Sequence, residues 1–236
     1  MNLVVVDTET SDLPANGGQL LELAWIVLEY KNAIWVPVRA EEKYVQYMGP
    51  ISVHALAIHH IKADQLTSAG GAVTREQAIL TLLQDLQQDS FIVAHNADFD
   101  AKFLPEISTP WICTMRISKA IWPEAPGHSN QVLRYWLGVE PDLTIASQIR
   151  HRNPHEALYD AATTAGILRK MLERHTPQEL YNMSKNPVRL KTISFGKHRG
   201  TAFDAIPLDY LHWLRRTNNL DPDVKFTIDD VLKGAP

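Results

Sequence analysis

The segment LVVVDTET places two acids, Asp7 and Glu9, directly after a short apolar run. A continuous, β-branched run of this length is typical of a buried strand. Because side chains alternate between the two faces of a strand, Asp7 and Glu9 should point the same way. Two carboxylates a few ångströms apart either raise one pKa or hold a cation, and their hard oxygens suit Mg²⁺ or Mn²⁺.

A structural interpretation of the same segment also exists. Thr8, Thr10 and Ser11 are typical of a turn that follows a strand. The surrounding charge favours the metal site, because the first thirty residues contain five acids and no lysine or arginine. Nothing local can therefore neutralise the pair of carboxylates.

Further acids follow similar apolar segments. HNADFD places Asp98 and Asp100 after a second apolar strand, and HEALYD places Asp160 in a helix with an apolar stripe. An ionised aspartate near a packing face is costly unless it is paired or metal-bound. His155 precedes Asp160 by five residues, about 140° around a helix, so His155 should lie at or before the first turn.

The composition sets the limits for the fold. The chain has 236 residues, 45% of them hydrophobic, which is enough for one good core and a small appendage. A single cysteine, Cys113, excludes an internal disulfide and a cysteine-based zinc site. No apolar stretch approaches the length of a membrane span, so we expect a cytoplasmic protein without a membrane partner, and no protein partner is indicated.

The elements that must position the acids form an α/β pattern with a mixed sheet edge. A tight turn at Lys31–Asn32 should join the second and third strands as a hairpin. Thr74 and Gln77 form a capping box that should start a helix ending near Gln88. Strands are expected at 3–7, 19–30, 33–39, 90–95 and 110–114, and further helices near 52–60, 97–104, 115–122, 129–138 and 156–174.

The last fifty residues differ from the rest of the chain. TISFGKHRGTAF predicts a strand, a tight turn and a strand, and LDYLHWLRRT predicts a helix. Residues 185–216 contain seven lysines and arginines against two acids, and a second basic segment, QIRHRNPH, spans 148–155. Both segments are candidates for phosphate contact, although solvated charged faces are common and the formal net charge is −4.

The segments DTET, HNADFD and HEALYD resemble the three motifs of the DEDDh exonucleases, the DnaQ-like branch of the ribonuclease H-like fold. AIHHI, WICTMR and FGKHRG also occur in the order seen in this family, so the resemblance covers nearly the whole chain. It implies an α/β fold, a ribonuclease H-like mixed β-sheet flanked by helices, with a small C-terminal appendage. We divide the chain into an exonuclease domain at 1–183, a linker at 184–187 and a C-terminal module at 188–236.

The resemblance also assigns the catalytic residues. It implies that two Mg²⁺ ions, replaceable by Mn²⁺, are held by four acids and that His155 is the general base. The second motif matches Asp100 rather than Asp98, and two residues two positions apart on a helix do not share a face. The metal ligands implied are Asp7, Glu9, Asp100 and Asp160.

Substrate contacts are implied at positions flanking these motifs. Leu13 could act as a wedge against the terminal base or pack beneath its own loop, and Asn96 could brace the backbone instead of binding substrate. Asp12 stands where the family has a glycine, which changes the loop that carries Leu13. The candidate substrate-binding residues are Thr8, Thr10, Leu13, His59, Asn96, Lys197 and Arg199.

The implied activity is 3′–5′ hydrolysis of DNA to 5′ mononucleotides, in DNA repair or turnover, on single-stranded 3′ ends and with duplex ends as a further option. Trimming of RNA 3′ ends is an alternative, since the catalytic motifs do not separate the sugars, although FGKHRG favours DNA. A non-catalytic nucleic-acid-binding protein would have lost at least one metal acid, and all five catalytic positions are filled.

Overall fold

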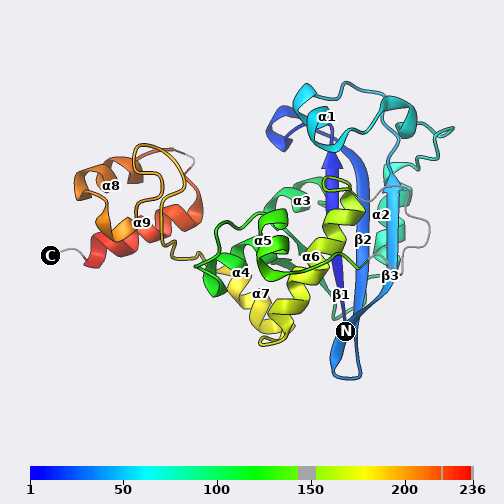
Figure 1. The fold of residues 1–236 in the computed structure, drawn as a ribbon. Coiled ribbons are helices and arrows are strands. Elements are labelled where there is room, and N and C mark those ends of the chain that lie inside the picture. Colours follow the sequence, from blue (N-terminus) through cyan, green and yellow to red (C-terminus); the bar gives the residue numbers. More distant parts are fainter. Residues whose placement is uncertain (143–152, 219, 235–236) are drawn as a thin grey trace.

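The computed structural model describes residues 1–142, 153–218 and 220–234. The chain forms a five-stranded mixed sheet in the order β3-β2-β1-β4-β5 (Figure 1), which confirms the predicted α/β fold with a mixed sheet. β1 pairs antiparallel with β2 and parallel with β4, and β4 pairs parallel with β5. The strands are β1 (Asn2–Thr10), β2 (Leu20–Lys31), β3 (Ile34–Tyr44), β4 (Phe91–Ala94) and β5 (Trp111–Cys113).

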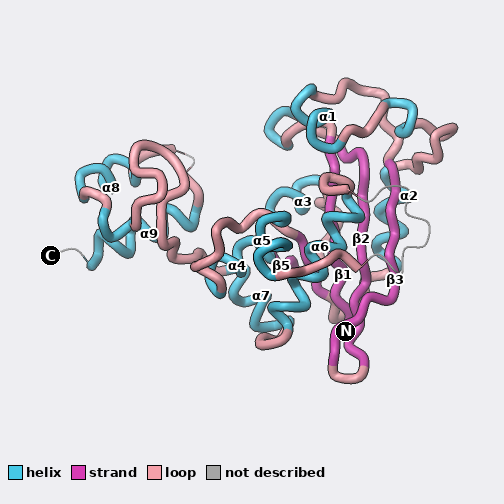
Figure 2. Tube along the Cα trace, in the orientation of Figure 1, coloured by secondary structure: helices cyan, strands magenta, loops and turns pink. Residues whose placement is uncertain are grey.

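Strand β1 lies at the centre of the sheet, and its apolar run is buried on both faces. Leu3 and Val5 belong to a hydrophobic cluster with helices α4 to α7 on one face. Val4 and Val6 belong to a second cluster with α2 and α3 on the other face. Helices therefore cover both faces, as Figure 2 shows, which explains why this strand is continuously apolar.

The described residues form three short 3-10 turns and nine α-helices. The 3-10 turns are Pro14–Asn16, Ala63–Leu66 and Phe203–Ala205. The α-helices are α1 (Val53–His59), α2 (Arg75–Gln84), α3 (Ala97–Phe103), α4 (Thr114–Ile121), α5 (Asn130–Leu137), α6 (Ala157–Leu172), α7 (Pro177–Lys185), α8 (Leu208–Arg215) and α9 (Pro222–Gly234). None of them is long and apolar enough to cross a membrane, within the described part of the chain.

Several predicted boundaries shift in the structure: β1 continues to Thr10 instead of ending at residue 7, and β3 continues to Tyr44 instead of ending at residue 39. Lys31 still pairs with Ile34, so the hairpin turn is Asn32–Ala33, one residue later than expected. Both turn residues have positive φ, which suits the twist of a two-residue hairpin. The Thr74 capping box is confirmed, but α2 ends at Gln84 rather than near Gln88. Asp85, the residue after the end of α2, is bonded to the sheet: the Nε1 group of Trp25 in β2 donates to its carboxylate at 2.7 Å.

The C-terminal region has its own hydrophobic cluster. The predicted strand pair is wrong for the described residues, which form only an isolated bridge between Thr192 and Ala202. The chain turns inward directly after this bridge, where Phe203 is fully buried and begins a 3-10 turn. The predicted helix is confirmed as α8, and α9 was not anticipated. The cluster consists of Ile193, Phe203, Ile206, Leu211, Leu214, Val224 and Ile228.

One joint connects this module to the helices beside the sheet. Asp223 of α9 is buried, and the Lys119 ammonium of α4 lies 3.0 Å from its carboxylate. The Val188 backbone N–H donates to the other carboxylate oxygen at 3.0 Å. Helix α7 continues through Ser184 and Lys185, two residues that the sequence assigned to the linker. The proposed domain division stays a prediction.

Candidate active site

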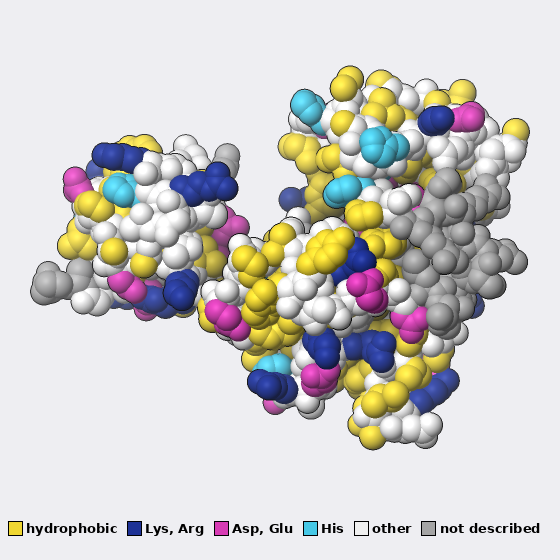
Figure 3. Space-filling model, viewed as in Figure 1, with side chains coloured by type: hydrophobic (Ala, Val, Ile, Leu, Met, Phe, Trp, Pro, Cys, Tyr) yellow, Lys and Arg dark blue, Asp and Glu magenta, His cyan; other side chains and the backbone are white. Residues whose placement is uncertain are grey.

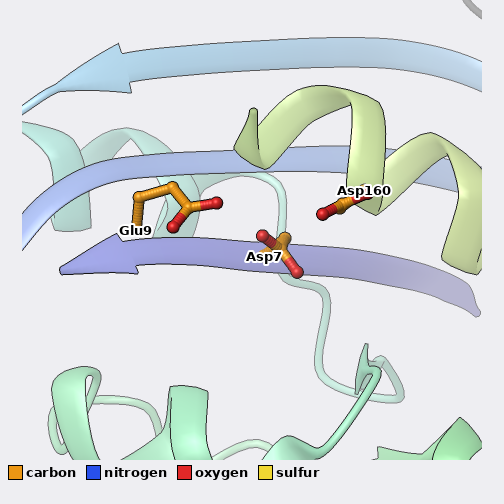
Figure 4. Close-up of side chains that lie close together, drawn as sticks. All are labelled: Asp7, Glu9 and Asp160. Atoms are coloured by element: carbon orange, nitrogen blue, oxygen red, sulfur yellow. The ribbon is translucent and has the colours of Figure 1, made fainter. Parts of the chain in front are cut away.

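Three carboxylates meet above the centre of the sheet. Ligand oxygens of Asp7, Glu9 and Asp160 all lie within 4.8 Å of one another. In Figure 4, Asp7 and Glu9 project from β1 toward the helix that carries Asp160. Strand β1 supplies two acids to one face because its side chains alternate, and α6 packs along that face.

Of the two aspartates in the second motif, Asp100 lies near the three carboxylates and Asp98 does not. Asp100 is 3% exposed, and the Thr8 hydroxyl donates to its Oδ1 atom at 2.8 Å. Its negative charge raises the pKa of Asp7 and of Glu9, so it lies within electrostatic reach of the cluster. The Asp98 side chain is 73% exposed and forms an ion pair with Arg116 at 3.1 Å.

Burial raises the pKa of all four acids, and repulsion from neighbouring acids adds to the shift of Asp7 and Glu9. Burial raises the pKa of Asp7 well above its usual range, and Asp100, Asp160 and Glu9 add to the shift. Burial also raises the pKa of Glu9 to about 8 and that of Asp100 to about 7, and it raises the pKa of Asp160. In the part of the chain that the structure describes, no lysine or arginine forms an ion pair with these four acids.

This arrangement fits a divalent cation. Opposite ligands of an octahedral Mg²⁺ ion are about 4 Å apart, which is comparable to the 4.8 Å within which the three ligand oxygens lie. A bound cation would favour the ionised acids and offset the burial and repulsion that now raise their pKa values. The residues present therefore fit the metal that the sequence predicts.

His155 lies just before α6, as expected from its spacing to Asp160. It has a φ of 70°, and its backbone N–H donates to Asp160 Oδ2 at 3.1 Å. The other carboxylate oxygen of Asp160 accepts the Gln131 side-chain amide at 2.9 Å. The left-handed turn thus ties the His155 backbone to a cluster acid while the residue remains exposed. In the neighbouring basic segment, 148–152 lie outside the described residues.

The predicted substrate residues near β1 have different surroundings. Thr8 is buried, and its hydroxyl donates to Asp100 and so positions that acid. The Thr10 hydroxyl donates to the Asp12 carbonyl at 3.1 Å. Leu13 is 58% exposed, so it does not pack beneath its own loop. Its direct contact with substrate stays a prediction.

His59 and Asn96 also differ from each other. His59 is buried, its Nδ1 atom accepts the Ile61 N–H at 2.9 Å, and its Nε2 atom lies 3.2 Å from the Thr10 carbonyl oxygen. Because Nδ1 is an acceptor, Nε2 carries the proton and donates. Both ring nitrogens therefore bond to the backbone. Asn96 is exposed at the start of α3, with a φ of 77° and no side-chain cap.

The structure does not bring Lys197 and Arg199 into the acid cluster. Both are exposed on the C-terminal module, whose hydrophobic cluster is separate from the two clusters on the sheet. Their contact with substrate remains a prediction.

Glu22 is a residue that the sequence reasoning missed. It lies opposite Glu9 in the pairing of β1 with β2 and is 1% exposed. Its Oε2 atom accepts the Ala157 N–H at 3.2 Å, which holds the first turn of α6 against the sheet. Burial raises its pKa, with a further contribution from Glu42. An acid inside the apolar strand sequence LLELAWIVL was the available signal.

A comparison with known proteins fits this geometry. A sequence model of the exonuclease family matches residues 4–168. The chain belongs to the exonuclease family. Exodeoxyribonuclease 10 of Escherichia coli strain K12 is 32% identical and aligns over 99% of this chain and 100% of its own length.

Solved structures show the same fold. Exonuclease X in complex with 5′ overhanging duplex DNA is 27% identical, with a TM-score of 0.62, over 77% of this chain and 99% of that chain. The nuclease domain of 3′hExo, a DEDDh family member bound to rAMP, is 18% identical with a TM-score of 0.55 over 73% and 92% of the two chains, and it supports the fold alone. The predicted membership of the DEDDh exonucleases and the ribonuclease H-like fold are confirmed, and this exonuclease is a hydrolase.

Proposed function

We propose that this exonuclease hydrolyses DNA from 3′ ends and releases 5′ mononucleotides. The main support is the group of Asp7, Glu9 and Asp160, with Asp100 within electrostatic reach of it, which no lysine or arginine of the described residues neutralises. DNA is favoured over RNA because the relative that aligns along nearly the whole chain is named as an exodeoxyribonuclease.

The four acids would hold two Mg²⁺ ions, with Mn²⁺ as a substitute. Two bound ions would supply Lewis-acid activation of water and charge stabilisation at the scissile phosphate. Thr8 and Gln131 orient the acids, because each donates a hydrogen bond to a carboxylate oxygen of the cluster. Such supporting hydrogen bonds fix the direction of a ligand and its basicity.

His155 would accept the proton of the attacking water. Imidazole is the side chain that enzymes use most often for general acid–base catalysis. The backbone bond from His155 to Asp160 ties the turn that carries the imidazole to the acid cluster. The water oxygen then bonds to phosphorus while the bond to the 3′ oxygen of the penultimate nucleotide breaks, and that oxygen takes up a proton.

The direct test compares single-stranded DNA and RNA of one sequence, each labelled at the 5′ end, in the presence of Mg²⁺. We expect a ladder of DNA fragments that shortens from the 3′ end and little cleavage of RNA. EDTA should abolish cleavage, and Ca²⁺ should bind without supporting turnover because it tolerates looser geometry than Mg²⁺. Full activity in EDTA would contradict the metal mechanism, and faster cleavage of RNA would contradict the proposed substrate.

A further inference from the structure

A row of aromatic rings lies on the surface of the C-terminal module. The ring centroids of His198 and Tyr210 are 4.5 Å apart, and those of Tyr210 and Trp213 are 5.3 Å apart. Tyr210 and Trp213 are three residues apart in α8 and so lie on one side of that helix. Leu211 and Leu214 are buried in the module, whereas Trp213 is 60% exposed. Tyr210 packs against the hydrophobic cluster of the module, and Trp213 lies outside it.

These rings line a small hollow. It has a volume of about 320 Å³ and is also lined by Lys197, Pro207 and Asp209. This volume is at the lower end of the range for small-ligand pockets, roughly 300–1,000 Å³, and suits one planar group. Asp209 is the acid of the hollow, and its carboxylate accepts the Tyr210 N–H at 2.8 Å. Its charge favours a neutral occupant over an anion at that point.

Positive charge lies beside the rings on a tight turn. Lys197 and Arg199 flank His198 between Gly196 and Gly200, both of which have positive φ. A Cβ atom on Gly196 would lie 2.9 Å from the Tyr210 hydroxyl oxygen, so glycine permits the close approach of the turn to the ring. The turn thus places two cations next to the aromatic row.

Lys197 and Arg199 differ from Arg189 and Arg215 of the same module in their ion pairing. Arg189 pairs with Asp204 and Asp230, and Arg215 pairs with Asp229. No acid among the described residues forms an ion pair with Lys197 or Arg199. Figure 3 shows lysine and arginine side chains on the visible face of this module. The charge beside the hollow is therefore available to an anion from outside the chain.

We propose that the hollow takes one unpaired base of a single-stranded DNA segment, while neighbouring phosphates of that strand contact Lys197 and Arg199. A base is neutral and planar, which suits the rings and Asp209, and its strand carries an anion on each side, which suits the turn. Aromatic rings beside a basic surface are the usual means of binding single strands without reading sequence. This inference rests on the proposed function, because it concerns the DNA substrate of the same enzyme.

The first experiment measures binding of a labelled oligothymidylate of about twenty nucleotides, longer than the sites of most single-strand modules. The full chain is used in EDTA, so that no cleavage occurs. Trp213→Ala should weaken binding about tenfold, as expected for the loss of one stacked base, and Trp213→Phe should restore most of it. The matched control is Phe226→Ala, which removes another exposed ring of the module that does not line the hollow and should leave affinity unchanged.

The second experiment tests the cations through salt dependence. Lys197→Ala combined with Arg199→Ala should weaken binding and reduce the slope of log affinity against log salt by about 1.4, the value for two lost phosphate contacts. Lys225→Ala combined with Lys233→Ala removes the same charge from exposed sites on α9 and should leave the slope unchanged. Equal slopes for both double variants would overturn the phosphate contact.

A third measurement separates this inference from the proposed function. The loss of kcat/KM caused by Trp213→Ala should grow with the length of the DNA strand, because the hollow lies on a module whose hydrophobic cluster is separate from the one beneath the active site. Wild-type affinity in Trp213→Ala, or equal losses in Trp213→Ala and Phe226→Ala, would overturn the base site. If the wild-type protein fails to hydrolyse any DNA strand, the proposed function fails, whereas the binding measurements in EDTA still decide the base site.

Discussion

Buried and half-buried aspartates occur in two regions of this molecule, and their surroundings are opposite. In the active site, Asp7 and Asp100 lie among other acids, and their pKa values are raised. At the joint to the C-terminal module, Asp223 is 2% exposed but has the Lys119 ammonium 3.0 Å away and accepts the Val188 N–H. The chain supplies the partners of Asp223, whereas it surrounds Asp7 with like charge.

The presence or absence of a partner within the chain distinguishes a structural acid from a functional one. A buried charge is tolerated when it is paired and hydrogen-bonded, which describes the joint. Buried acids that repel one another destabilise the metal-free protein, and a fold keeps such a cluster when a ligand from outside completes it. Substitutions in the two regions should therefore affect activity and stability differently.

The largest expected effect is on the rate of hydrolysis. Asp7→Asn keeps the shape of the side chain but removes the charge that holds a cation, so kcat should fall by more than about 10³-fold, more than the loss of one hydrogen-bond donor at a transition state. Asp223→Asn should keep the rate on a dinucleotide within about threefold, although it weakens a buried pair. Single-turnover rates with saturating Mg²⁺ make the comparison. Similar losses in both variants would mean that the pairing of a buried acid does not predict its role.

The second prediction compares two aspartates of one helix. Asp100→Asn should reduce kcat by about 10²–10³-fold, comparable to the loss of an electrostatic contact in an active site. Asp98→Asn should retain most of the activity, because its exposed side chain pairs with Arg116 and not with the cluster. Equal losses would show that the motif is assigned to the wrong aspartate.

The third prediction concerns His155. His155→Ala should lower kcat by about 10²-fold at neutral pH, within the range for loss of a general base. The deficit should shrink as the pH rises, because hydroxide can replace the base. A pH–rate profile of the variant and the wild type measures this difference. A constant deficit at all pH values would assign His155 to positioning instead of proton transfer.

The fourth prediction concerns stability and metal. Burial raises the pKa of Glu9 to about 8 and of Asp100 to about 7 in the folded protein, from 4.5 and 3.8. The folded state then binds more protons than the unfolded state between about pH 4 and pH 8, so the stability of the metal-free protein falls as pH rises through that range. Mg²⁺ should therefore raise the melting temperature more at pH 8 than at pH 5. Asp7→Asn, which removes one repelling charge, should show a shallower fall, and a metal effect independent of pH would contradict the account.

Much of the fold and the site was predictable from local pattern. The apolar run before Asp7 predicts a buried strand, and the period of two along that strand places Glu9 on the same side. The spacing of His155 from Asp160 correctly predicts that His155 precedes the helix. These features depend on neighbours within a few residues, which a sequence shows directly.

The remaining features depend on contacts between distant residues. The end of α2 is set by a bond between Asp85 and Trp25, sixty positions apart. The buried pair of Asp223 and Lys119 joins residues more than a hundred positions apart, and no local signal marks either one. The strand pair expected around 192–203 does not form because burial of Phe203 pulls the chain into a turn. Tertiary packing decides these cases over local propensity.

The smallest expected effect concerns Glu22, a buried acid that shares one property with the active-site acids and one with the structural acid Asp223. Its pKa is raised as in the cluster, yet its carboxylate accepts the Ala157 N–H as a structural residue would. Glu22→Gln keeps an oxygen for that bond and removes the charge, so kcat should stay within about threefold, well short of the 10–100-fold loss seen when the support of a metal ligand is removed.

Because the folded pKa is raised, the ionised acid disfavours folding above its unfolded pKa, and the variant should melt at a higher temperature at pH 8 with little change near pH 4. Glu22→Ala removes the oxygen as well and serves as the contrast, with a lower rate because the first turn of α6 loses its anchor. A loss in Glu22→Gln as large as that in Asp7→Asn would place Glu22 among the metal-binding acids and not beside them.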